Sequence, residues 1–277
     1  MEKVIVKTVS IDSPEFLQDV PNILYKYRDW NNPFHRNLLQ KGELFFASIS
    51  GFNDPFDGTI PHRYAPEELT EDNIFKKYLE ITTRKFPHLT ETAIHEKCYE
   101  YQRRGYFHNE KYLEDFEKDT CERLNEQFGI ACLSKKNDNI LMWSHYANCH
   151  TGICLGFNKY KLFYDTEAVF KHVKYSEDLP MLSLFEDVYT YYSKLIGTKS
   201  ILWDYEKEYR LSKTNFANQI AKLQKQTIEE VILGAKMDQN IKFNIIDYIK
   251  ENLPHVKVYD AKISKTKFTI DTTMRIY

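Results

Sequence analysis

The order of the strand-like and helix-like sequence patterns constrains the fold of this chain more than any other feature. Short β-prone runs occupy roughly residues 20–60 and 128–277, whereas residues 65–127 repeat polar and apolar side chains at helical spacing. Strand runs separated by one helical block favour an α+β fold over a regular alternation of strands and helices. We therefore expect a single domain over residues 1–277, built on a mixed and mainly antiparallel β core, with residues 65–127 as an inserted helical layer.

The helical block is expected to hold three amphipathic helices. Thr70 and Thr90 stand where N-caps of the first two would lie. Another short helix is expected in the run NNPFHRNLLQKG, with Gly42 just past its end. The alternating residues 2–8 are expected to form a short strand.

The composition is that of a folded protein kept in a reducing compartment. Hydrophobic residues make up 42% of the chain and charged residues 28%, and the net charge of −2 gives no basic footprint for nucleic acid or an anionic membrane. No apolar run approaches the roughly 18–20 residues of a membrane span, and the N-terminal segment lacks the apolar region of a secretion signal. The five cysteines are odd in number, without a Cys-x-x-Cys pair, which favours the cytoplasm.

The run LYKYR is the first motif with chemical interest. Arg28 would stand at a strand end beside Tyr27, and its guanidinium offers a rigid fork of donors for phosphate or carboxylate. A structural pairing of Arg28 with a nearby acid is the alternative. Neither the G-x-G-x-x-G nor the P-loop pattern is present, so the two common phosphate-binding loops are absent.

The run FFASISGFNDPFDG is the second motif. Ser48 and Ser50 would point to one face of a strand, because side chains alternate along it. Asn53, Asp54 and Asp57 suggest a metal loop, but no bidentate acid follows at EF-hand spacing. Capping of turns is the favoured role for Asn53 and Asp54.

The run MWSHYANCHTG gathers aromatic side chains with polar tips. Trp143, His145, Tyr146 and His150 suit stacking on a flat ring and hydrogen bonding at its edge. The two histidines with Cys149 could instead bind zinc, although no second cluster at ligand spacing supports this. A buried aromatic turn with satisfied imidazoles is the third interpretation.

The run WDYEKEYR is the fourth motif. If it is a strand, Glu206, Glu208 and Arg210 point to one face. Two carboxylates on one face repel each other unless a cation lies between them. Arg210 would supply that cation in a purely structural arrangement, and a cationic substrate centre would supply it in a functional one. We expect this strand and Arg28 to approach each other in one pocket.

Together, these motifs resemble the bacterial family named domain of unknown function 2971 (DUF2971). The resemblance rests on LYKYR, GELFFASISGFNDPFDG, FGIACLS, NILMWSHYANCHTGICLGF, WDYEKEYR and VILG, in that order, from about Leu24 to Gly234. The family name carries no activity. A role as a toxin or in defence against phages would suit a bacterial protein of this sort, but no residue indicates it.

A more remote resemblance links the chain to ADP-ribosyltransferases of the arginine–serine–glutamate type. Tyr27-Arg28 is similar to the arginine of their first strand, Ser48-Ile-Ser50 to their Ser-Thr-Ser strand, and Glu206-Lys207-Glu208 to their Glu-x-Glu. The resemblance implies an ADP-ribosyltransferase-like fold and NAD as substrate. It also implies that Arg28 grips the pyrophosphate, that Ser48 shapes the nicotinamide pocket, and that Glu208 stabilises the cationic ribose. The chain departs from these enzymes in the long separation of its serine and glutamate motifs.

Three functions remain open at this point. The leading expectation is cleavage of the nicotinamide–ribose bond of NAD, with transfer of ADP-ribose to an unidentified macromolecule or to water and with no metal. Trp143 or Tyr146 would stack on the ligand, and His145, His150, Ser50 and Arg210 would complete the site. The alternatives are a sensor that binds a nucleotide-like ligand without chemistry, and a hydrolase with a metal on His145 and His150 and one aspartate, Asp54 or Asp57.

Overall fold

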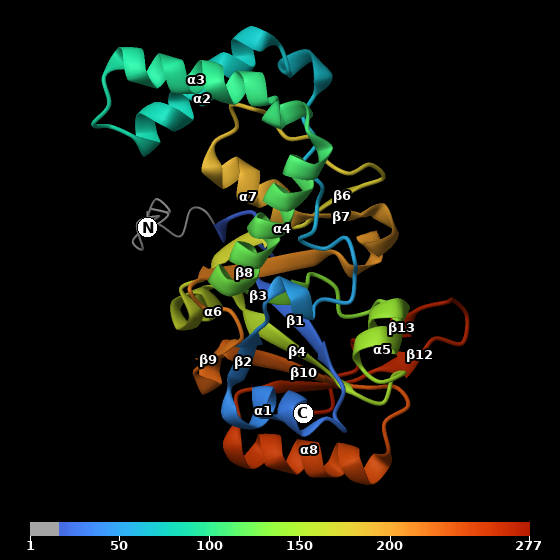
Figure 1. The fold of residues 1–277 in the computed structure, drawn as a ribbon. Coiled ribbons are helices and arrows are strands. Elements are labelled where there is room, and N and C mark those ends of the chain that lie inside the picture. The colour runs from blue at the N-terminus through green and yellow to red at the C-terminus, as the bar shows by residue number, and fades with distance from the viewer. Residues whose placement is uncertain (1–16) are drawn as a thin grey trace.

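The computed structural model describes residues 17–277, which surround a seven-stranded sheet (Figure 1). The strand order is β11-β10-β4-β1-β3-β8-β5. Its strands are β1 (Ile23–Arg28), β3 (Phe128–Ser134), β4 (Ile153–Asn158), β5 (Val169–His172), β8 (Glu208–Thr214), β10 (Ile228–Leu233) and β11 (Lys257–Asp260). Within this sheet, β10 and β11 are the only neighbouring strands that run parallel, so the expectation of a mixed, mainly antiparallel α+β fold is confirmed. The strand expected at residues 2–8 lies outside the described residues.

Three two-stranded sheets and eight α-helices complete the described part of the chain. The small sheets pair β2 (Glu43–Phe46) with β9 (Gln219–Lys222), β6 (Lys174–Ser176) with β7 (Thr198–Ser200), and β12 (Lys262–Ile263) with β13 (Ile270–Asp271). The helices are α1 (Pro33–Lys41), α2 (Glu71–Lys85), α3 (Glu91–Arg104), α4 (Glu110–Gln127), α5 (Ile140–Tyr146), α6 (Lys159–Thr166), α7 (Val188–Gly197) and α8 (Gln239–Asn252). No helix among residues 17–277 is both long enough and apolar enough to cross a membrane.

Local sequence signals set the helix ends. The side chains of Thr70 and Thr90 accept hydrogen bonds from the backbone of Asn73 and Ala93, as expected for N-caps. Helix α1 ends at Gly42, whose φ of 65° is left-handed. A Cβ there would meet Leu223 O at 2.4 Å, so this position requires glycine for space as well as for conformation.

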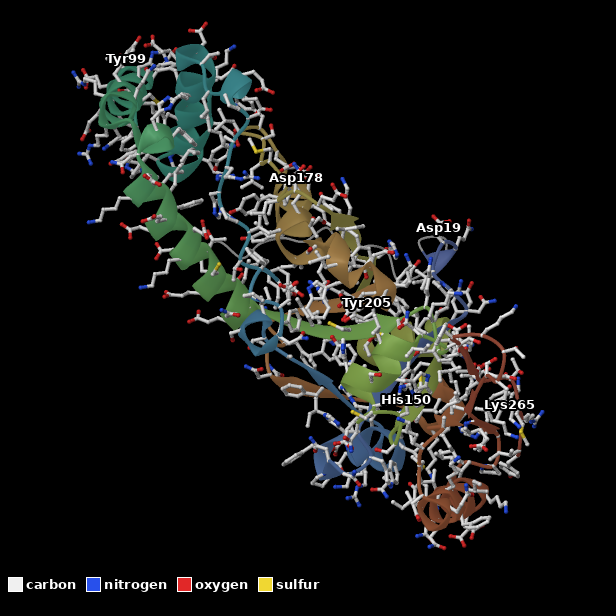
Figure 2. The ribbon with its side chains drawn as sticks, turned by 90° about the vertical axis from the view of Figure 1, so that its right-hand side faces the viewer. Asp19, Tyr99, His150, Asp178, Tyr205 and Lys265 are labelled. Atoms are coloured by element: carbon white, nitrogen blue, oxygen red, sulfur yellow. The ribbon has the colours of Figure 1, made fainter. Side chains whose placement is uncertain are left out.

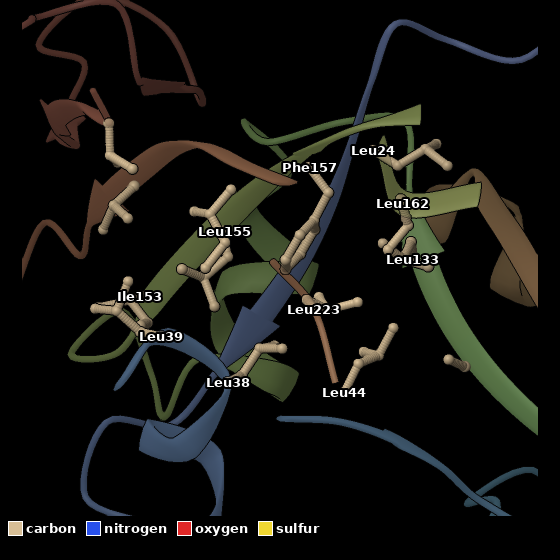
Figure 3. Close-up of a cluster of buried hydrophobic side chains, with 14 of the residues drawn as sticks. Leu24, Leu38, Leu39, Leu44, Leu133, Ile153, Leu155, Phe157, Leu162 and Leu223 are labelled. Carbon is tan, nitrogen blue, oxygen red and sulfur yellow. The ribbon is translucent and has the colours of Figure 1, made fainter. Parts of the chain in front are cut away.

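Apolar side chains bury both faces of the central sheet. One face carries Leu24, Leu133, Leu155 and Phe157, which pack with residues of α1, α6 and α8 in the main core (Figure 3). The other face carries Tyr27, Cys154 and Ile232, which pack against Trp143 of α5. Because large apolar side chains contribute most of the burial energy, this arrangement fixes β1 and β4 at the centre of the molecule.

Helices α2 and α3 form an arm beyond one end of the sheet (Figure 1). Ile74, Tyr78, Ile94 and Cys98 pack with Leu184 in a cluster separate from the main core. In Figure 2 the molecule is elongated, with Tyr99 at the tip of this arm and Lys265 near the opposite end. The expected helical layer on the sheet therefore takes a different form, because α2 and α3 bury their apolar faces against each other.

Two expected strands are shorter than their sequence patterns. The run WDYEKEYR begins as a 3₁₀ helix over Ile201–Glu206, and β8 starts only at Glu208, after Lys207 at a φ of 45°. Strand β2 ends at Phe46, and Ile49–Gly51 is a 3₁₀ turn. The idea that Ser48 and Ser50 share one face of a strand is therefore wrong, although their hydroxyls lie 3.0 Å apart.

Candidate functional site

A cluster of buried charges lies where β8 begins. It consists of Asp57, Lys199, Glu206, Glu208 and Arg210, and we call it the charge cluster. Each of these residues is buried. They come from a loop, β7, the 3₁₀ helix and β8, so the fold joins segments that are far apart in sequence.

Arg210 is the most heavily bonded member of the charge cluster. Its Nε and Nη2 donate to the two oxygens of Glu208 at 2.9 and 3.1 Å, and its Nη1 and Nη2 donate to the two oxygens of Asp57 at 2.6 and 2.5 Å. Its remaining donor reaches Ile196 O at 2.7 Å. A guanidinium has five N–H donors, so every donor of Arg210 is used within the protein.

Lys199 connects the two glutamates. Its Nζ lies 2.7 Å from Glu206 Oε2 and 3.6 Å from Glu208 Oε2. The other oxygen of Glu206 accepts a 2.6 Å hydrogen bond from the Tyr146 hydroxyl. Glu206 lies in the 3₁₀ helix and Glu208 in β8, so the two do not share a strand face as expected. They share the cation of Lys199 instead.

The two glutamates differ in their ionisation. Burial favours the protonated form of Glu208, but Arg210 and Lys199 outweigh it and lower the pKa of this carboxyl to about 2. Burial and the nearby charge of Glu208 raise the pKa of Glu206 above its usual value despite Lys199. Burial likewise raises the pKa of Asp57. Glu208 is therefore a permanent carboxylate, whereas Glu206 holds a proton more readily.

Strand β1 separates from β3 beside the charge cluster. The two strands share one registered pair, Tyr25 with Ser134. Strand β8 pairs with the opposite edge of β3 along its whole length, so Ala47, which bridges to Ile130, must occupy the edge that faces β1. We call the opening at Cys132, between β1 and Ala47, the fork.

Lys26 and Arg28 extend from β1 at the fork. The buried Lys26 donates from Nζ to Cys132 O at 2.5 Å. The half-buried Arg28 makes a single 3.5 Å hydrogen bond, to Tyr27 O, and no acidic side chain among residues 17–277 pairs with it. Burial lowers the pKa of Arg28 to about 10, so its guanidinium remains charged at neutral pH.

Cys132 links Arg28 to the charge cluster. Its half-buried side chain interacts electrostatically with Arg28, Lys26, Glu208 and Arg210. Burial and the Glu208 carboxylate raise the pKa of its thiol. Arg28 and Glu208 therefore both interact with Cys132, whereas the expectation that they meet in one pocket stays a prediction.

The aromatic run around α5 is placed differently from the expectation. Trp143 is fully buried, donates from Nε1 to Asn137 O at 2.8 Å and packs edge-on against Tyr27. Tyr27 is buried as well and donates to Lys136 O. The expectation that Trp143 stacks on a ligand does not fit this burial, because its indole is part of the core. Tyr146 does reach the charge cluster, through Glu206.

The two histidines of this run have separate partners. His145 Nδ1 lies 3.0 Å from the Tyr205 hydroxyl, and His150 Nε2 lies 3.1 Å from Ser144 Oγ. His150 is buried in a turn where it adopts a φ of 73°. Between Leu17 and Tyr277, no three side chains of His, Cys, Asp or Glu are grouped so that they could hold a metal ion together.

Sequence reasoning missed three residues of this region. Lys26 stands inside LYKYR, between the residues that drew attention, and Asp57 was assessed only as a possible metal ligand. Lys199 carries no motif, because its role depends on the pairing of β7 with β6. A cavity of about 480 Å³ lies elsewhere, where α4 meets the arm beside His62 and Glu117, and no predicted site residue lines it.

The fold and the site define a mixed α+β protein with a buried charge cluster and a forked sheet. Residues 142–265, slightly under half of the chain, match the family model described as "Protein of unknown function (DUF2971)", which supports the resemblance to that family. The match includes Lys199, Glu206, Glu208 and Arg210 but neither Arg28 nor Asp57. No curated protein and no solved structure matches the chain.

Proposed function

We propose that the chain cleaves the bond between nicotinamide and ribose in NAD and transfers ADP-ribose to a macromolecule or to water. The observation that carries the proposal is that Cys132 interacts electrostatically both with Arg28, which pairs with no acid among the described residues, and with the ionised carboxylate of Glu208. NAD has the complementary pattern, because its pyrophosphate is anionic and its nicotinamide end is cationic.

The contrast between Arg28 and Arg210 supports Arg28 as the residue that binds the phosphate. Arg210 uses all its donors within the protein, whereas Arg28 makes one long bond to a backbone oxygen. A guanidinium with open donors matches phosphate in two parallel bonds. The half-buried Arg28 and Cys132 mark where this region reaches the surface.

The carboxylates support the chemical step. The C1′–N bond breaks, its electron pair passes to nicotinamide, and positive charge develops on the ribose. The permanently ionised Glu208 would stabilise that charge in surroundings of low dielectric. Water or an acceptor hydroxyl then adds at C1′ and gives up a proton, which Glu206 is suited to receive because burial raises its pKa. Ser48 would support the pocket, as the resemblance implies.

Binding of a nucleotide-like ligand without chemistry is the second candidate. Arg210 clamps both oxygens of Glu208, and a clamped carboxylate has less capacity to respond to a substrate cation. Under this alternative, Arg28 would bind the ligand and the charge cluster would serve stability alone.

Release of nicotinamide from NAD by the purified chain tests the proposal. We expect release by the wild type, its loss in Arg28→Gln and in Glu208→Gln, and no change in the matched surface variant Lys250→Gln. Binding of NAD without release by any form of the folded protein would establish the second candidate instead.

A further inference from the structure

The two cations at the fork, Lys26 and Arg28, have more hydrogen-bond donors than hydrogen-bond partners. An ammonium group has three donors and a guanidinium has five. Lys26 uses one on Cys132 O, and Arg28 uses one on Tyr27 O at the long distance of 3.5 Å. Neither makes an ion pair with any residue between Leu17 and Tyr277.

Lys26 has one cation, Arg28, and one carboxylate, Glu208, among the charged groups that act on it. Lys26 and Arg28 are two positions apart on β1, so they extend from the same face of the strand. The groups that interact with Lys26 are Arg28 on the same strand, His35 on α1, Cys132 on β3 and Glu208 on β8. Glu208 is already clamped by Arg210, so the repulsion between the two cations has no dedicated counter-charge.

We propose that Lys26 and Arg28 together bind a diphosphate group and that Lys26 takes up one proton from solvent when the diphosphate binds. Two adjacent anionic groups would match two adjacent cations, and they would satisfy donors that the fold leaves open. The inference rests on the proposed function for the identity of the ligand as an ADP-ribosyl compound. It adds a second phosphate contact and a proton that the resemblance to ADP-ribosyltransferases does not imply.

The ionisation of Lys26 makes the proton detectable. Burial, together with repulsion from Arg28, lowers the pKa of Lys26 to about 7. At pH 8 its amine is therefore mostly neutral in the free protein. A bound diphosphate favours the ammonium form and raises the pKa, so binding above pH 7 takes up a proton. Affinity should then fall as pH rises from about 7, by about tenfold per pH unit at most.

Calorimetry with ADP-ribose measures this proton directly. ADP-ribose keeps the diphosphate and lacks nicotinamide, so its binding does not depend on cleavage. Titrations at pH 8 in two buffers with different ionisation enthalpies give the number of protons taken up. We expect about one for the wild type and for the surface control Lys250→Gln, and none detectable with adenosine, which has no diphosphate.

Two variants at Lys26 separate ligand binding from a structural role. Lys26→Gln should bind ADP-ribose at least about tenfold more weakly at pH 6.5 and take up no proton, because one charged phosphate contact is lost. Lys26→Arg stays charged, so it should bind at pH 8 without proton uptake and with affinity independent of pH between 7 and 9. If Lys26→Gln does not fold, Lys26→Arg alone decides the question.

The outcomes separate this inference from the proposed function. Proton uptake that disappears in Lys26→Arg, without nicotinamide release from NAD, would support the diphosphate site and reject cleavage. Nicotinamide release by the wild type, with equal proton uptake in the wild type and in Lys26→Arg, would overturn the inference alone. Failure of the wild type to bind ADP-ribose at pH 6.5 would overturn the inference whatever the result with NAD.

Discussion

Asp57 and Arg210 form a two-bond pair across 153 positions of sequence, with donor–acceptor distances of 2.6 and 2.5 Å. Asp57 belongs to the loop after β2, and Arg210 lies in the second half of the chain, on β8. Phe52, from the same loop, lies against the Arg210 guanidinium at 5.3 Å. The pair therefore holds the loop of residues 52–57 over the start of β8 and closes the charge cluster from that side.

Asp57→Asn should destabilise the protein strongly. The substitution keeps the shape but leaves the charge of Arg210 with one buried acid fewer, and loss of one partner of a buried pair costs roughly 3–5 kcal/mol. Urea unfolding measures the change in the free energy of unfolding. The control is Glu43→Gln, which breaks the exposed pair with Lys222 and should change the stability little, because solvent screens such a pair.

A double variant sharpens this measurement. Arg210→Met removes the cation and leaves Glu208 with Lys199 as its remaining ion-pair partner, so it should also be destabilising. If the pair acts as a unit, Asp57→Asn combined with Arg210→Met should cost clearly less than the sum of the two single changes. Simple additivity would show that Asp57 and Arg210 contribute independently.

Glu208 should govern part of the stability of the protein in acid. Its pKa is lowered from 4.5 to about 2 in the folded state, so its stabilising contribution is complete above pH 4.5 and is lost as pH falls toward 2. The contribution is on the order of 3 kcal/mol. Glu206 and Asp57 act in the opposite sense, because their raised pKa values make the folded state bind protons more readily.

Comparison of wild type with Glu208→Gln isolates this contribution. The difference between their free energies of unfolding should shrink as pH is lowered from 5 to 2, because the wild type loses its carboxylate while the variant has none to lose. A difference that stays constant across this range would mean that Glu208 titrates normally in the folded protein.

The sequence predicted the elements of the fold better than their arrangement. Helical spacing and caps at Thr70 and Thr90 located α2 and α3, because these signals are local. The placement of both helices in an arm depends on contacts with Leu184, more than 80 positions away. No local pattern contains that information.

The residues of the candidate site also fall into two groups, those that local sequence motifs indicate and those that only the fold brings together. Arg28, Glu206 and Glu208 stand in motifs whose residue types indicate charge chemistry, so they could be selected from the sequence. Lys199 could not, because a lysine in the middle of the three-residue strand β7 gives no signal until β6 and β7 pair. The expectation for Trp143 was wrong because a tryptophan among polar residues can either stack on a ligand or pack in the core. The burial of its side chain, which distinguishes the two roles, is known only from the structure.

Trp143 should contribute to stability and not to ligand affinity. Trp143→Ala would leave a large cavity and should cost roughly 3–5 kcal/mol. The matched control is Leu202→Ala, at a side chain that is 81% exposed, which should change stability by about 0.5 kcal/mol or less. The milder Trp143→Phe should lower the melting temperature and leave the affinity for ADP-ribose unchanged. A loss of affinity in this folded variant would return Trp143 to the ligand site.

The two glutamates should separate in a paired test of activity and stability. If the chain cleaves NAD, Glu208→Gln should lower nicotinamide release by about 10²–10³, because one preorganised charge opposite the cationic ribose is lost. Glu206→Gln should slow release by about 10²–10⁴ where proton removal limits the rate, and this loss should diminish with acceptors that are already ionised. Each variant is measured twice, by nicotinamide release and by thermal unfolding. Lost release with an intact melting temperature assigns catalysis to that glutamate. A collapsed melting temperature with lost release assigns Glu208 to the clamp with Arg210, and normal values of both remove the residue from either role.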